Sequence, residues 1–201
     1  MHVLTDTLIP FFTEYKSIIV IVHLLSAAVG VGGATVTDLL FFKFLKDFKI
    51  TKIEADTMNS ISALIWIALF VLIISGIALY LPENDRLNDS AKFLTKIIAI
   101  IVLVVNGTIL NVFIAPKLPL ISFKDKNIQI ENKHNTLRHF AFAFGAISIS
   151  SWYFVFILGA LRKFTLNFGE FILIYAALLF IAIVGSQIFN YRLSKKTYEI
   201  K

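Results

Sequence analysis

The chain has 201 residues, of which 58% are hydrophobic and only 16% are charged, and its formal net charge is +6. Soluble domains are less apolar and carry about 25% charged residues, so this composition excludes an ordinary soluble domain. The absence of cysteine from these residues excludes disulfides, thiolate metal sites, iron–sulfur clusters and haem attachment through C-x-x-C-H. The basic residues lie in loops between apolar segments, so we expect a membrane topology signal and no nucleic-acid partner.

The apolar residues form five blocks, each close to the roughly 20 residues that span the hydrocarbon of a bilayer as a helix. In chain order the predicted helices cover residues 17–42, 60–81, 93–115, 139–161 and 171–191. Pro82 ends the second block and Pro116 the third, since proline cannot continue a helix. The polar stretch 117–138 has room for a short surface helix. The sequence therefore predicts an all-α integral membrane protein with a single domain, a bundle of about five transmembrane helices in contact with lipid.

The distribution of Lys and Arg predicts the orientation of this bundle. The side that carries the N-terminus has six: Lys16, Arg86, Lys92, Lys96, Arg162 and Lys163. The opposite side has thirteen: Lys43, Lys46, Lys49, Lys52, Lys117, Lys124, Lys126, Lys133, Arg138, Arg192, Lys195, Lys196 and Lys201. Because cytoplasmic loops retain positive charge, we predict the N-terminus outside and the C-terminus inside, in a multi-pass protein of the bacterial inner membrane.

The first predicted helix carries a continuous stripe of polar and small residues at helical spacing: His23, Ser26, Ala27, Gly30, Gly33, Ala34, Thr37 and Asp38. Small side chains let neighbouring helices approach closely, so one interpretation of the stripe is a packing seam. A flat cofactor would need the same absence of bulk. The stripe alone does not separate the two interpretations.

His23 lies about 9 Å inside this helix, at a depth where ionisable residues are rare and face the bundle interior. A neutral imidazole bonded to a neighbouring helix is one interpretation, and an axial ligand to haem iron is the other. Asp38 lies about 22 Å further along the same axis and cannot share a site with His23. We expect Asp38 to pair with Arg138 or a loop lysine.

Polar residues in the later helices give further candidates. Lys96 either snorkels to the headgroups or, facing inward, neutralises a carboxylate such as a haem propionate. Asn106 is expected near the middle of the bilayer, where it can bond to a neighbouring helix. His139, expected in the first turn of the fourth helix, is a second and weaker candidate metal ligand. It lies roughly 20 Å from His23 along the membrane normal, so the two cannot hold one iron.

The pattern His23-Leu-Leu-Ser-Ala-Ala-Val-Gly-Val-Gly-Gly, with Lys96 opening the third helix, resembles the bacterial membrane proteins around HemJ, a haem-binding protoporphyrinogen oxidase, and the CopD copper-resistance proteins. The resemblance covers about the first three helices, and a closer likeness is to uncharacterised bacterial membrane proteins with the same first-helix pattern. It implies His23 as haem ligand and Lys96 as a functional lysine. HemJ-type proteins have a histidine ten residues after that lysine, where this chain has Asn106.

Three functional hypotheses follow. The first is a protein that binds haem b or a porphyrin for redox or electron transfer, and possible oxidoreductase chemistry, with His23, Ser26, Gly30, Lys96 and Asn106 around the cofactor. The second is a permease for a small solute or ion, with a polar path along Asp38, Asn106, Asn111 and Gln187. The third is a non-catalytic subunit whose glycine stripe docks a partner membrane subunit or a second copy.

Overall fold

The computed structural model describes residues 2–44, 50–120, 128–161 and 166–199. The long elements are α2 (Lys16–Phe44), α3 (Lys52–Tyr80), α5 (Ala91–Ile109), α6 (Ile128–Ala160) and α7 (Phe168–Glu199). The shorter elements are α1 (His2–Glu14), η2 (Leu81–Glu83), α4 (Asn84–Asn88), the π-helical η3 (Leu110–Ile114) and the 3-10 helix η4 (Ala115–Leu120). Five stretches of the described chain are long and apolar enough to cross a membrane, which confirms the predicted all-α membrane bundle.

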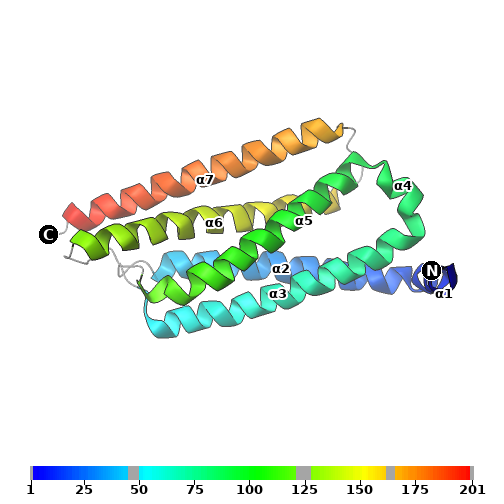
Figure 1. Cartoon of the computed structure of the whole chain (residues 1–201), viewed down its shortest axis with the longest axis horizontal. Coiled ribbons are helices and arrows are strands. Elements are labelled where there is room, and N and C mark those ends of the chain that lie inside the picture. The colour runs from blue at the N-terminus through cyan, green and yellow to red at the C-terminus, as the bar shows by residue number, and fades with distance from the viewer. Residues whose placement is uncertain (1, 45–49, 121–127, 162–165, 200–201) are drawn as a thin grey trace.

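The long helices run antiparallel to one another in chain order (Figure 1). One end of the bundle carries the N-terminus and α4, and we call it the α4 end. The other end carries the last turn of α2, the first turn of α3, element η4 and the C-terminus, and we call it the C-terminal end. The N-terminus and C-terminus therefore lie at opposite ends of the bundle, as the five predicted crossings require.

Two helices begin earlier than predicted because polar caps define their first turns. At α3, the Thr51 side chain accepts a bond from the Glu54 amide while the Glu54 carboxylate accepts one from the Thr51 amide at 2.8 Å. At α7, Asn167 and Glu170 bond reciprocally in the same way, at 2.8 and 3.0 Å. These capping boxes satisfy amides that have no partner within the helix. As a result, α3 begins at Lys52 instead of the predicted residue 60. Helix α7 begins at Phe168 instead of the predicted residue 171.

Two further boundaries differ from the sequence prediction. Helix α6 begins at Ile128 and not at residue 139, so His139 lies in the body of the helix instead of its first turn. Helix α1 was not predicted at all, and it lies crosswise to α2 at the α4 end (Figure 1). At this end Glu83 pairs with both Lys16 and Arg86, so the start of α2 is tied to the turn that follows α3.

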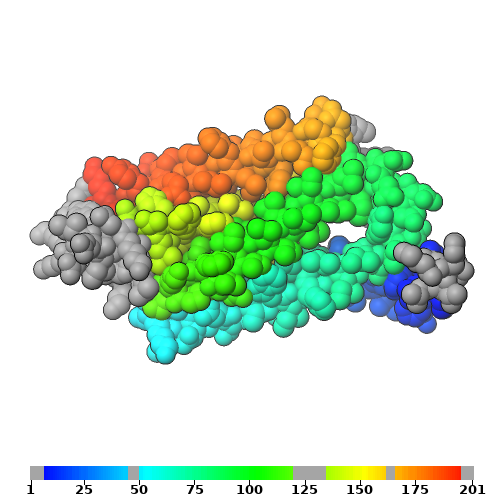
Figure 2. Space-filling model, in the orientation of Figure 1, coloured from blue at the N-terminus to red at the C-terminus, as the bar shows by residue number. Residues whose placement is uncertain are grey.

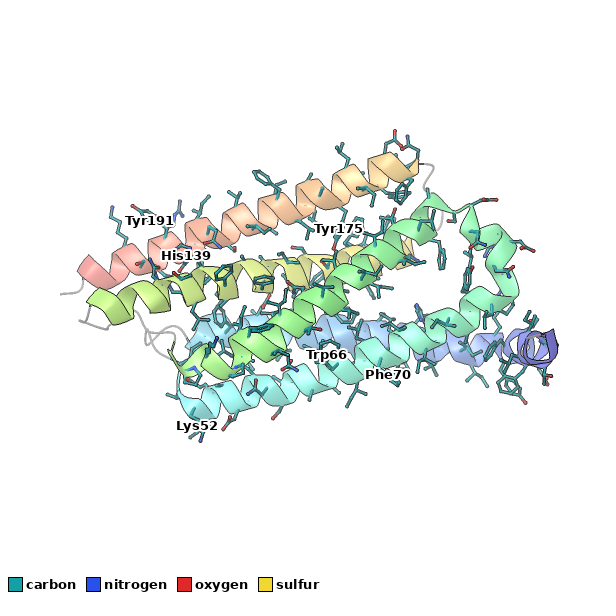
Figure 3. The ribbon with its side chains drawn as sticks, viewed as in Figure 1. Lys52, Trp66, Phe70, His139, Tyr175 and Tyr191 are labelled. Carbon is teal, nitrogen blue, oxygen red and sulfur yellow. The ribbon has the colours of Figure 1, made fainter. Side chains whose placement is uncertain are left out.

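Apolar side chains cover the outside of the bundle. On α7 alone, Leu173, Phe180 and Ile181 are each about 70% exposed, at 72%, 68% and 68%. Figure 3 shows Phe70 of α3 and Tyr191 of α7, both largely exposed, on the outer sides of their helices. An exposed apolar surface of this extent fits contact with the hydrocarbon of a bilayer.

The core consists of three buried clusters stacked along the bundle. The cluster at the C-terminal end includes Phe41, Met58 and Phe142, and the cluster at the α4 end joins α5, α6 and α7. The middle cluster contains Leu69, Leu72, Leu103 and Trp152. Helices α3 and α5 diverge toward the α4 end, where Figure 2 shows an opening between them.

Candidate functional site

An internal cavity of about 510 Å³ lies between α2, α3, α5 and α6, in the half of the bundle nearer the C-terminal end, and reaches part of α7. Most of its wall is apolar. Its polar side chains are Thr35, Thr37, Asp38, Asn59, Ser62, Asn111, Ser148, Ser150 and Ser186. Both tryptophans of the chain, Trp66 and Trp152, line it as well. A volume of this size is in the range of small-molecule sites.

Asp38 of α2 is the one charged side chain in the described wall of this cavity. It faces Gly145 of α6, where an added Cβ would lie 3.7 Å from Asp38 Oδ1, an ordinary contact distance. Within the ranges that the structure describes, Asp38 has no hydrogen bond and no ion pair. A carboxylate in an apolar wall without a partner is costly, which marks it as a candidate functional group.

The expected pairing of Asp38 with Arg138 is wrong. Arg138 is buried and donates from Nε to Asn190 Oδ1 at 2.7 Å and from Nη2 to Asn135 Oδ1 at 2.7 Å. Two amide side chains therefore hold the guanidinium away from the cavity. The loop lysines Lys46 and Lys49 lie outside the described residues.

Asn111 enters the cavity wall from the π-helical segment η3. The amide of Ala115 bonds to the carbonyl of Leu110, an i to i+5 step that replaces the regular α-helical bond. Pro116 and Pro119 follow directly and have no amide hydrogen, so α5 cannot continue as a regular α-helix here. Short π-helical turns within helices occur frequently at functional sites.

Asn59, Ser62 and Trp66 extend the cavity wall along α3, and sequence reasoning did not single them out as site residues. Their spacing of three and four residues puts them on one face of a helix, so the sequence did contain this signal. Trp66 lies against Gly107 of α5, where an added Cβ would be 3.3 Å from the indole (Figure 3). The missing side chain at Gly107 thus lets α5 approach the indole.

His23 does not line the cavity. Its Nδ1 lies 2.9 Å from Ser75 Oγ on α3, and its ring is adjacent to Gly76. Ser75 donates its hydroxyl hydrogen to the carbonyl of Val71 at 2.7 Å, so its oxygen accepts from Nδ1–H of His23. The neutral imidazole then has its lone pair on Nε2. Of the two interpretations of His23, the bond to a neighbouring helix is present, and the role as haem ligand stays a prediction.

The other predicted cofactor residues lie in separate surroundings. Ser26 donates to the Val22 carbonyl of its own helix at 2.7 Å, and the indole of Trp152 covers Gly30. Asn106 donates to the Phe144 carbonyl of α6 at 3.1 Å, the predicted bond between helices, while its Oδ1 is buried without a partner. Lys96 is half-buried and comes near His23 from α5. His23, Ser26 and Gly30 share one face of α2, but Ser26, Gly30 and Asn106 each contact a different neighbour.

His139 lies at the C-terminal end, far from His23. Its Nδ1 is 2.5 Å from Gln187 Oε1 and 3.1 Å from Asn190 Nδ2, and the residue is exposed between α6 and α7 (Figure 3). Because Asp38 faces Gly145, antiparallel packing brings His139 level with Phe44, about 30 Å along α2 from His23. Among the described residues, no group of three or more His, Asp or Glu could hold a metal ion.

The fold and the cavity define a multi-pass α-helical membrane protein with a largely apolar cavity inside the bundle that contains one carboxylate. Comparisons with protein-family models, with curated proteins and with solved structures give no match.

Proposed function

We propose that the protein is a permease that takes a small polar solute or ion into the cavity between α2, α3, α5 and α6 and passes it across the membrane. The observation that supports this proposal most directly is Asp38, an ionisable group in the cavity wall with no partner among the described residues. Retaining a charge inside a membrane bundle is costly, and such residues typically mark solute and ion pathways.

The arrangement around the cavity also supports a pathway. Solute would reach the cavity from the C-terminal end, which the distribution of Lys and Arg predicts to be cytoplasmic. Toward the α4 end, Leu69, Leu103 and Trp152 belong both to the cavity wall and to the buried middle cluster. Passage beyond this cluster requires α3 or α5 to move relative to α6, and the divergence of α3 and α5 leaves space for that movement.

Uptake into proteoliposomes tests the permease proposal. Purified protein would be reconstituted and assayed with radiolabelled methylammonium, choline, glycerol and urea. We expect saturable uptake of at least one solute above that of empty liposomes, and its loss in Asp38→Asn. Asp56→Asn is the matched control, because Asp56 is an exposed residue of α3 outside the cavity. Uptake equal to that of empty liposomes for every solute would refute the proposal.

Haem or porphyrin binding at His23, with a redox or electron-transfer role in a bacterial inner membrane, is our second proposal. One specific observation favours it: Ser75 Oγ lies 2.9 Å from Nδ1 of His23, and in the tautomer whose Nδ1–H donates to Ser75 the Nε2 lone pair is available. Histidines that bind metals are commonly oriented by a second hydrogen bond of this kind. The described residues near His23 offer this single ligand, with Lys96 as the cation that could face a propionate. A bound haem would supply one-electron chemistry.

A reduced-minus-oxidised absorption spectrum tests this second proposal. We expect protein purified from haem-replete bacteria to show a Soret band that His23→Ala abolishes. Ser75→Ala is expected to weaken the band, because the imidazole loses the contact that orients it. Colourless wild-type protein would rule the proposal out. A partner subunit or second copy at the α2 seam is now less favoured, because Trp152 and Ile65 of this chain already cover Gly30 and Gly33.

A further inference from the structure

We infer that the solute of the cavity is a small organic monocation, a protonated or quaternary amine, with its charge at Asp38 and its apolar body against the tryptophans. This inference rests on the proposed permease function and specifies its substrate class. It is carried by the charge, the size and the aromatic wall of the cavity.

The charge of the cavity selects a cation. Asp38 is the one charged residue in the described wall, and no Lys or Arg accompanies it there. An anion would meet this carboxylate without compensation in a medium of low dielectric constant. A neutral solute would leave the carboxylate as costly as it is in the empty cavity. A solute with a single positive charge would pair with the carboxylate and remove this cost.

The size and composition of the wall select an organic cation over a metal ion. A cavity of about 510 Å³ is far larger than a bare ion, and most of its wall is apolar. Calcium ions take six to eight oxygen ligands, and other hard cations also need a full oxygen shell. In this wall the polar side chains are spread over α2, α3, α5, α6 and α7, around a single carboxylate. This arrangement provides one ionic contact and a large apolar surface.

The aromatic residues lie where the body of such a solute would extend. Trp152 covers Gly30, which is eight residues before Asp38 and thus about 12 Å away along α2. Trp66 lines the cavity from α3, opposite Gly107. Indole rings are large apolar surfaces against which the body of such a solute can pack. The cavity therefore presents one carboxylate and, toward the α4 end, two indole rings.

Tryptophan fluorescence gives a direct test, because both tryptophans of the chain line the cavity. Detergent-solubilised full-length protein would be titrated with choline and with 3,3-dimethylbutan-1-ol, the neutral molecule of nearly the same shape. We expect a saturable fluorescence change with choline, and binding of the alcohol at least tenfold weaker. Asp38→Asn is expected to lose the preference for choline, while Asp56→Asn retains it.

Two outcomes would overturn the inference, and they differ in what they imply for the permease. Equal affinity of wild-type protein for choline and the alcohol would show that the cavity binds solutes without selecting charge, so the permease proposal would stand. A choline response unchanged in Asp38→Asn would remove Asp38 as the recognition group. The comparison of the two ligands uses wild-type protein, so it holds even where a variant fails to fold. The uptake assay tests the permease separately, because saturable uptake of any of the four solutes, charged or uncharged, supports transport.

Discussion

Asp38 is half-buried, and its surroundings differ from those of the paired polar residues inside the bundle. Arg138 and Asn190 bond to each other, and Ser151 bonds to the hydroxyl of Tyr175 at 2.7 Å. These pairs hold helices together, because each polar group satisfies another in surroundings without water. Asp38 has no such bond among the described residues, so its retention is better explained by a ligand than by the fold.

Substitution of Asp38 tests this difference between functional and structural polar residues. We expect Asp38→Asn to leave the thermal midpoint in detergent unchanged or raise it, because a charge without a partner is removed. Asn190→Ala is the contrasting variant, since it removes the acceptor for Nε of the buried Arg138 and should cost about 1–3 kcal/mol. A clear fall of the midpoint in Asp38→Asn would show that the carboxylate has a structural partner.

Gly30 and Gly32 of α2 form a matched pair for testing the packing seam. A Cβ at Gly30 would overlap the indole of Trp152, whereas a Cβ at Gly32 meets nothing within 4 Å. We expect Gly30→Ala to destabilise the bundle by about 1–3 kcal/mol through overpacking. Gly32→Ala should be neutral or stabilising by up to about 1 kcal/mol, since alanine favours the helix. Thermal unfolding of both variants measures this, and equal effects would contradict the observed contact.

At the level of the elements, the polar caps at the helix ends are the features that sequence reasoning missed. The lengths of the apolar segments predicted each transmembrane helix, because a helix that spans the bilayer needs a long apolar run. Such a run can be recognised in the sequence alone. The helix starts were predicted too late because residues 52–59 and 128–138 are polar and read as loops. Once Thr51 and Glu54 satisfy the first amides, polar residues can extend a helix beyond the apolar block.

The capping box of α3 leads to a prediction of its own. Thr51→Ala removes the acceptor for the Glu54 amide, so we expect a loss of about 0.5–2 kcal/mol in unfolding free energy. Thr57→Ala is the control, because Thr57 is exposed and bonds only to the Ile53 carbonyl one turn earlier in the same helix. Comparable losses in the two variants would show that the cap contributes nothing particular to α3.

The candidate site was also only partly predictable from the sequence, and the reason again concerns the helices and how they pack. Sequence spacing located the stripe on α2 and its two ionisable residues, because one helix imposes its own periodicity. Which neighbour each residue meets depends on how the helices cross. Trp152 fills the space over Gly30, Ser75 bonds to the ring of His23, and Asp38 lies opposite Gly145. No single segment of sequence contains these contacts.

For the whole molecule, the membrane orientation follows from the charge distribution together with the opposite placement of the termini. We predict that a C-terminal green fluorescent protein fusion is fluorescent in a bacterial host and that a C-terminal alkaline phosphatase fusion is inactive. Both readouts depend on whether the C-terminus stays in the cytoplasm. The opposite pair of results would show that the bundle has the inverted orientation, with the cavity in the outer half of the membrane.

The central claim is that water and solutes reach Asp38 from the C-terminal end. Because the chain has no cysteine, Asp38→Cys introduces a single thiol, and Ile67→Cys, 61% exposed on the apolar outer surface, is the control. A cationic, membrane-impermeant methanethiosulfonate would be applied to each face of sealed vesicles. We predict that Asp38→Cys reacts from the face that carries the C-terminus, while Ile67→Cys remains unreactive. An Asp38→Cys thiol that reacts from neither face until the protein is unfolded would contradict the account.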